Sequence, residues 1–180
     1  MGKPYYTLEK MSPERSIGYL IKRCGVLMTQ IGERRFNSQP ISFFQWMILI
    51  RLTICAHASP TELSDHLGYD MGALTRVVDE LEKRELVRRE RSREDRRAVQ
   101  IALTPEGRRL ANVGARVVIE LLNELVEPFS IAEIDALIAN LQKLLVRMQD
   151  RANQTLPSQP KPKVSAGPPK RAAGRRNARS

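Results

Sequence analysis

The segment SPTELSDHLGYDMGALTRVVDELEKREL, residues 59–86, carries the start and stop signals of two short helices in close succession. Ser59 suits an N-cap, and Glu62, three residues later, completes a capping box. Gly68 can end this helix, and Asp70 can cap the next one almost at once. Two short helices joined by a tight turn that contains glycine predict a helix-turn-helix.

The next segment, VRRERSREDRRAVQIAL at residues 87–103, holds six arginines and predicts a β-hairpin with a long, exposed tip. Val87 opens one strand, and Val99, Ile101 and Leu103 alternate along the other. A helix-turn-helix followed by a hairpin predicts a winged helix, whose second helix fits the major groove of B-DNA. The hairpin, called the wing below, would reach the neighbouring minor groove, where a strongly negative potential favours an inserted arginine.

The arginines of the wing have two expected positions. Three are expected at the tip, in the minor groove: Arg93, Arg96 and Arg97. Three are expected to flank the sugar-phosphate wall: Arg88, Arg89 and Arg91. Asp95 would pair with Arg97 and hold that guanidinium in position. The Ser59 end of the first short helix would offer free N–H groups to a phosphate.

Four further helices are predicted, mainly from apolar residues that recur at spacings of three and four. One starts at Pro13, and a second spans 41–58 and is apolar nearly all round, which places it centrally. Another follows Thr104 and ends at Pro128, and the last opens at Ser130 with a heptad seam. The fold class is therefore mainly α with a small β-hairpin wing, a winged helix-turn-helix with N- and C-terminal dimerisation helices.

Apolar stripes on the first helix and on the last two would stay largely exposed in a monomer, which soluble proteins rarely allow. We therefore expect a two-fold homodimer that presents two recognition helices about 34 Å apart, one helical turn of DNA. The folded domain is expected over residues 1–152. Residues 153–180 are rich in Pro, Gly, Ala, Lys and Arg, a composition that cannot bury a core and predicts disorder.

The formal net charge of +10 is distributed unevenly. Residues 157–180 contain seven Lys or Arg and no acid, which leaves 23 basic and 20 acidic residues in the rest of the chain. Basic patches bind polyanions, of which nucleic acid is the commonest and an anionic membrane surface the rival. The tail is accordingly interpreted as a non-specific DNA arm, a solubility feature or an anchor to an anionic surface.

The sequence gives little support for a secreted protein, a membrane protein, a metal-binding protein or an enzyme. The start, MGKPYYTLEKMSPER, lacks the apolar run of a signal peptide, and FFQWMILI is too short to span a bilayer. Only two cysteines are present, Cys24 and Cys55, which fits a reducing cytoplasm. Cys55 and His57, even with Cys24 or His66 added, lack a cluster at ligand spacing, so no metal is expected. We find no phosphate loop, nucleophile elbow or paired carboxylates, so an enzyme is not expected.

The run from SPTELSDHLG through GALTRVVDELEKRELVRRERSREDRRAVQIALTPEG resembles the MarR family of bacterial transcription regulators. The helix-turn-helix register, the Asp-x-Arg at Asp95 and Arg97, and LTPEG after the second strand carry the resemblance, which covers roughly residues 13–150. It implies a homodimer with interlocked first, fifth and sixth helices, bound to a palindrome. It also implies a repressor that is relieved by a small aromatic or phenolic effector or by cysteine oxidation, with Thr75 and Arg76 touching bases or phosphates.

We therefore predict a sequence-specific, double-stranded DNA-binding transcription regulator in the bacterial cytoplasm, associated with the nucleoid and not with a membrane. The residues predicted to contact DNA are Ser59, Thr61, Gly72, Ala73, Thr75, Arg76, Arg89, Arg91, Arg93, Asp95, Arg96 and Arg97. Two alternatives remain at this point. One is an architectural, nucleoid-type DNA-binding protein without an effector, and the other is a cysteine-based redox-sensing repressor.

No cofactor is expected beyond a possible small aromatic or phenolic effector. Trp46, the single tryptophan, either lines an effector pocket or packs in the core. A carboxylate effector would need a nearby cation, which Arg15, Arg51 or His57 could provide. Cys24 falls on the apolar stripe of the first helix, which predicts a buried small hydrophobe. The alternative role, a redox sensor, needs an exposed and activated thiolate at Cys24.

Overall fold

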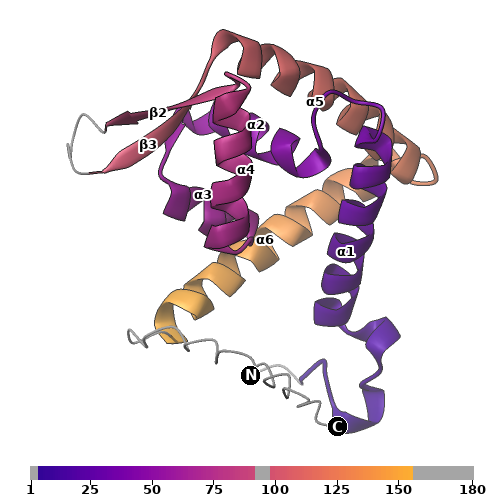
Figure 1. The fold of residues 1–180 in the computed structure, drawn as a ribbon. Helices are drawn as coiled ribbons and strands as arrows, with labels where there is room; N and C mark the ends of the chain where they lie inside the picture. The colour runs from indigo at the N-terminus through magenta and orange to yellow at the C-terminus, as the bar shows by residue number, and fades with distance from the viewer. Residues whose placement is uncertain (1–3, 92–97, 156–180) are drawn as a thin grey trace, which may run out of the picture. The chain divides into compact units, whose positions relative to one another are not determined.

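The computed structural model describes residues 4–91 and 98–155, and the chain divides into two compact units at Pro128. In its described part, the first unit combines helices α1–α5, two short 3-10 turns and a three-stranded antiparallel sheet (Figure 1). The described part of the second unit is the helix α6, Ile131–Thr155, which runs a little past the boundary expected at residue 152.

Each predicted helix and both wing strands are present, and most of their bounds are close to those expected. The helices of the first unit are α1 Ile17–Phe36, α2 Phe43–Cys55, α3 Pro60–Leu67, α4 Met71–Lys83 and α5 Pro105–Val126, preceded by the 3-10 turns η1 Leu8–Lys10 and η2 Pro13–Arg15. The strands are β1 His57–Ala58, β2 Val87–Arg91 and β3 Val99–Leu103, arranged in the order β1-β3-β2.

The helix starts are fixed by local capping, as the sequence predicts. The Ser59 hydroxyl accepts a hydrogen bond from Glu62 N at 3.2 Å, and the Glu62 carboxylate accepts one from Ser59 N at 2.7 Å. Asp70 caps α4, Thr104 caps α5, and Ser130 forms the same reciprocal box with a glutamate three residues on. These caps satisfy backbone donors that a helix start leaves without partners, so the chain enters each helix at a defined residue.

Two of the predicted helix boundaries are wrong. The first helix begins at Ile17 and not at Pro13, because η2 comes first and the Ser16 hydroxyl then caps the helix by accepting from Tyr19 N. The second helix ends at Cys55 instead of continuing to residue 58. Ala56 leaves the helical region with φ 60°, and the next two residues form β1 against the free edge of β3. The pairing with β3 satisfies backbone groups that a longer helix would have bonded internally.

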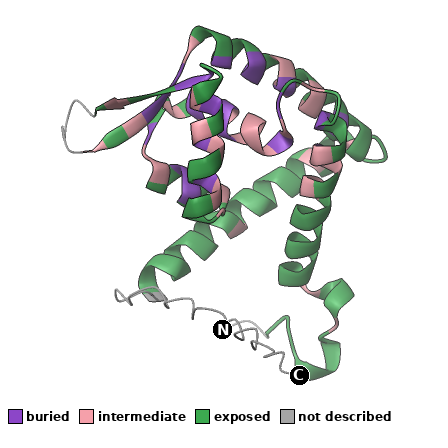
Figure 2. Ribbon diagram, viewed as in Figure 1, coloured by how far each residue is buried: buried purple, intermediate pink, exposed green. Residues whose placement is uncertain are grey.

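The core of the first unit lies between α2, α3, α4, α5 and the base of the wing, where Figure 2 shows the buried residues gathered. Ile48, Leu49 and Leu52 of α2 are fully buried, which confirms the central place predicted for this helix. Ile101 of β3 is also fully buried, whereas Val99, nearer the tip, is exposed. The wing is therefore anchored by its base and free of the core towards its tip (Figure 1).

Helices α1 and α6 expose their apolar stripes in the single chain. In α1 only Gly32 and Phe36 are buried, and in α6 Leu137 and Leu141 are about half exposed (52% and 44%) (Figure 2). Cys24 is exposed, so the prediction of a buried thiol is wrong for the single chain, in which the N-terminal part of this stripe is exposed. Among the described residues, no helix is long and apolar enough to cross a membrane.

Candidate nucleic-acid interface

Helix α4 presents one face to the core and the opposite face to solvent. Leu74, Val78 and Leu81 are buried, and Thr75 and Arg76 are exposed because consecutive residues of an α-helix lie about 100° apart. The Thr75 hydroxyl donates to a backbone carbonyl one turn earlier at 2.8 Å, and Arg76 Nε does the same at 3.3 Å. Both side chains are thus held along the exposed surface of a well-anchored helix.

The first turn of α4 is occupied by its own cap. The Asp70 carboxylate accepts hydrogen bonds from Gly72 N at 2.6 Å and from Ala73 N at 3.0 Å. Gly72 is exposed and Ala73 is half-buried. Both backbone N–H groups therefore already have a partner. Gly72 and Ala73 could contact DNA only through their other exposed atoms.

The start of α3 offers fewer free donors than the sequence suggests. Glu62 N donates to the Ser59 hydroxyl, and Leu63 N donates to the Ser59 carbonyl at 3.1 Å. Pro60 has no N–H, so within the described residues Thr61 supplies the one first-turn N–H without a protein partner. The backbone and side-chain hydrogen bonds from Ser59 lower the pKa of Glu62, which keeps a negative charge at this end of the helix. A phosphate here would bind through Thr61, beside that charge.

The two strands of the wing pair in antiparallel register from Val87 opposite Leu103 to Arg91 opposite Val99. Arg91 is exposed, and neither it nor Arg76 forms an ion pair with any residue that the structure describes. These two cations are thus available to an anionic partner. The four tip residues of the prediction lie outside the described residues: Arg93, Asp95, Arg96 and Arg97.

Arg89 has a different environment from Arg91. One of its terminal nitrogens, Nη2, donates to Asp79 Oδ1 at 2.5 Å, and the other, Nη1, donates to Glu82 Oε2. Its backbone N–H donates to Glu82 Oε1 at 3.1 Å. The hydrogen bond to Asp79 is the largest cause that raises the pKa of the Arg89 guanidinium, followed among the raising causes by the hydrogen bond to Glu82. Arg89 is therefore engaged by α4.

The other face of the wing carries a smaller set of charges. Arg88 Nε donates to Glu90 Oε1, and the second oxygen of Glu90 lies 3.8 Å from His57 Nδ1. His57 reaches this position because β1 pairs with β3 opposite Ala102. Arg88 and His57 both flank Glu90, so the sheet brings residues that are far apart in sequence to one surface.

The candidate effector residues have different neighbours in the structure. Trp46 packs against Phe36 and Phe43, with ring centroids 5.9 and 5.6 Å away, and its indole N–H donates to the Ala111 carbonyl at 3.0 Å. These contacts favour core packing over pocket lining for Trp46.

The three cations named with Trp46 lie elsewhere. Arg15 borders a surface depression with Tyr5, Tyr6 and Lys10, His57 lies on the sheet, and Arg51 acts electrostatically on Glu62. Cys55 donates through its thiol to a carbonyl of α2. Among the described residues, no group of three or more His, Cys, Asp or Glu could hold a metal ion.

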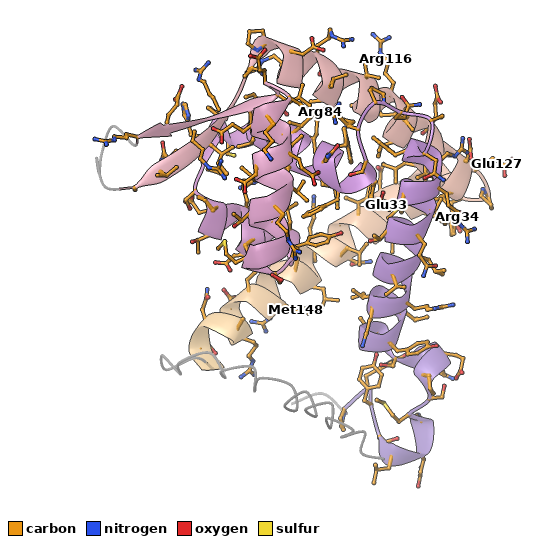
Figure 3. The ribbon with its side chains drawn as sticks, viewed as in Figure 1. Glu33, Arg34, Arg84, Arg116, Glu127 and Met148 are labelled. Atoms are coloured by element: carbon orange, nitrogen blue, oxygen red, sulfur yellow. The ribbon has the colours of Figure 1, made fainter. Side chains whose placement is uncertain are left out.

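Sequence reasoning missed the acidic partners of Arg89 and two contacts that brace the helix-turn-helix. Tyr69, in the turn between α3 and α4, stacks on Phe44 of α2 with ring centroids 3.9 Å apart. Arg84, at the end of α4 (Figure 3), donates to the Pro40 carbonyl at 2.7 Å and to Gln45 at 3.3 Å. The only sequence signal for the Arg89 contacts is that Asp79 and Glu82 are three residues apart and thus share a helix face.

Comparisons with known proteins agree with this geometry. Residues 41–99 match the model of the MarR family. The transcriptional repressor MprA of Escherichia coli K12 is 32% identical over 134 residues, which cover 72% of this chain and 76% of MprA. The HTH-type transcriptional regulator PrsX of Escherichia coli is 47% identical over 64 residues, which cover 34% of this chain and only 39% of PrsX.

A solved structure with operator DNA is also similar. A mutant MarR from Escherichia coli, complexed with operator DNA, superimposes with a TM-score of 0.61 at 28% identity. The match covers 72% of this chain and 93% of that chain. The similarity thus extends from the winged helix to most of a protein that binds DNA.

Proposed function

Because the chain belongs to the MarR family of transcription regulators, we propose that it is a repressor that binds a palindromic double-stranded operator as a homodimer. The observation that carries this proposal is the pairing of an exposed Thr75–Arg76 surface on α4 with a wing whose Arg91 is free of ion pairs within the described residues. Helix α4 would enter the major groove, and the wing would follow the backbone into the next minor groove.

The exposed apolar stripe of α1 supports the dimer. Ile17, Leu20 and Ile21 are 48%, 43% and 38% exposed, a contiguous apolar surface that a second copy would remove from water. Two-fold symmetry then places two recognition helices on one face of the duplex. Light scattering at micromolar concentration tests this step, and a mass of one chain under those conditions would refute it.

A small aromatic or phenolic effector would relieve repression. Members of the MarR family respond to ligands. An effector can relieve repression here only if its affinity differs between two states of the dimer that have different distances between the recognition helices. A thermal-shift screen of aromatic carboxylates and phenols tests this, since a ligand that binds only the folded state raises its stability. The Trp46 indole N–H already donates to a protein carbonyl. The binding site of any ligand found in the screen should therefore be located through its effects on other residues before Trp46 is assigned to it.

Fluorescence anisotropy with a labelled duplex, selected by the protein from a random pool, tests DNA binding. Arg97→Ala should weaken binding by about 1–3 kcal/mol, whereas Arg116→Ala, on the exposed surface of α5 (Figure 3), should leave it unchanged. Equal affinity of wild type and Arg97→Ala would remove the role given to the wing.

An architectural role without an effector is the alternative, and the basic segment at residues 157–180, with seven cations and no acid, is the observation that favours it. A nuclease footprint separates the two functions. One protected palindrome supports the regulator, and protection without sequence preference supports the architectural protein.

A further inference from the structure

The alternation of β2 places Arg89 and Arg91 on one face of the wing, two residues apart. Val87, which begins this face, is buried against the core, and α4 packs on β2. The side chain of Arg89 is 31% exposed and lies over α4. Arg91 extends beyond it towards the tip and is exposed.

Three groups on α4 and β2 form a closed set of contacts, here called the Arg89 cluster: Arg89, Asp79 and Glu82. The two carboxylates lie three residues apart, on one face of α4, and each takes one terminal nitrogen of the guanidinium. The planar guanidinium suits this arrangement because its donors are fixed in a fork. Two acceptors therefore hold both the position and the orientation of the Arg89 side chain.

Glu82 also bonds the backbone of the wing. In the strand order β1-β3-β2, β2 is an edge strand, and the Arg89 N–H donates to Glu82 Oε1 at 3.1 Å. An edge N–H would otherwise be left to solvent or to another chain. The same carboxylate thus fixes the strand through its main chain and through its side chain.

The charges of the cluster oppose contact with a phosphate. One cation faces two carboxylates, so a DNA phosphate that approached Arg89 would meet a net negative group of atoms. Arg91, two residues away on the same face, has no carboxylate partner among the described residues. The two arginines therefore differ in charge environment although they lie on one strand and one face.

We propose that Arg89 is a positioning residue, which fixes the angle between the wing and the recognition helix α4, and that Arg91 is the cation of this face that meets the phosphate backbone. This replaces the prediction that Arg89 itself contacts DNA, and it rests on the proposed function. The consequence is that DNA affinity depends on Arg89 through Asp79 and Glu82, because these contacts set where the tip of the wing lies relative to α4.

Salt dependence separates a positioning residue from a phosphate contact. Anisotropy with the selected duplex is measured over a KCl series at 25 °C for wild type, Arg89→Met, Arg89→Lys and Arg91→Met, after circular dichroism has shown each protein to be folded. Loss of one phosphate contact lowers the magnitude of the slope of log K against log salt by about 0.9. We expect this lowering, once per protomer, for Arg91→Met only.

Arg89→Met should weaken binding about three- to tenfold and keep the wild-type slope, since a bidentate charge network is lost but no phosphate contact. Arg89→Lys should not restore affinity, because a single ammonium group cannot replace the fork between two carboxylates. In an Asp79→Asn, Glu82→Gln background, adding Arg89→Met should change affinity no further. A lower slope in Arg89→Met that Arg89→Lys restores would overturn the proposal.

Hydrogen exchange of the DNA-free protein provides a second measurement that does not depend on the proposed function. The amides of residues 87–91 should exchange about tenfold faster in Arg89→Met and in the Asp79→Asn, Glu82→Gln variant, and at the wild-type rate in Arg91→Met. Wild-type exchange in Arg89→Met would overturn the proposed positioning. If the wild type binds no duplex at any salt concentration, the proposed function fails, and exchange alone then decides whether Arg89 fixes the wing.

Discussion

Replacing Gly107 by alanine should strain the junction between α4 and the wing. A Cβ at Gly107, in the first turn of α5, would lie 1.9 Å from the Leu86 carbonyl oxygen and 3.1 Å from Leu103 Cδ2. The Leu86 carbonyl accepts hydrogen bonds from Thr104 N at 3.2 Å and from the Thr104 hydroxyl at 3.1 Å. Because the clashing atom belongs to the backbone, the methyl group can be accommodated only if Leu86 moves away from these two donors.

The magnitude follows from three contributions. Overpacking costs about 1–3 kcal/mol, and each of the two hydrogen bonds at Leu86 contributes about 0.5–1.5 kcal/mol. Alanine returns at most about 1 kcal/mol, because it is a better helix former than glycine. We expect Gly107→Ala to lower the free energy of unfolding by about 1–5 kcal/mol, a large part of the 5–15 kcal/mol that is typical of a folded domain.

Urea unfolding, followed by circular dichroism, measures this loss. Gly25→Ala is the matched control, since Gly25 is also helical, but among the described residues no atom outside its own stretch of helix lies within 4 Å of its Cβ position. That variant should be up to about 1 kcal/mol more stable than the wild type. A Gly107→Ala protein that is as stable as wild type would refute the argument, because it would mean that Leu86 and its donors can move at no cost.

Three further outcomes are expected. Gly114→Ala, whose Cβ would lie 2.2 Å from Trp46 Cδ1, should cost about 1–3 kcal/mol and shift the emission of the single tryptophan in fluorescence spectra. Glu85→Gly should raise the free energy of unfolding by about 1 kcal/mol in urea titrations, because Glu85 holds φ 56°, where only glycine is unstrained. The hydrogen bonds from Ser59 lower the pKa of Glu62 below 4.5, so their stabilisation is present above pH 4.5 and is lost as pH falls through the lowered value. Acid titration of stability should therefore be flatter in Glu62→Gln than in the wild type over that range.

The features predicted correctly from sequence are those fixed by nearby residues. The Ser59–Glu62 box, the Asp70 cap and the Gly68 turn, with φ 69°, all depend on contacts within a few positions of the chain. The alternation of Ile101 and Leu103 likewise marks the inward face of β3, which the core confirms. Local caps and short-period patterns are therefore enough to predict the winged helix and the exposed face of α4.

The features that sequence missed depend on contacts between distant segments. Strand β1 exists because β3, some forty residues later in the chain, offers a free edge to His57. The sequence places Arg89 on the wing beside the sugar-phosphate wall, but its acidic partners on α4 become visible only when the hairpin folds back against that helix. Cys24 lies on an apolar stripe, but whether a stripe is buried depends on which surface covers it, and Cys24 is exposed in the single chain.

The short length of β1 gives the wing two parts with different stiffness. Strand β1 pairs only with Ala102 and Ile101 of β3, so at these two residues β3 has a paired strand on each side, β1 on one and β2 on the other. Beyond them, Gln100 and Val99 pair with β2 alone. A two-stranded ribbon is only marginally stable by itself, whereas three strands packed on a core are stable. Flexing should begin at the row of Gln100, so that the proposed phosphate contact of Arg91 could adjust to duplexes of different groove width while the hydrophobic interior keeps its packing.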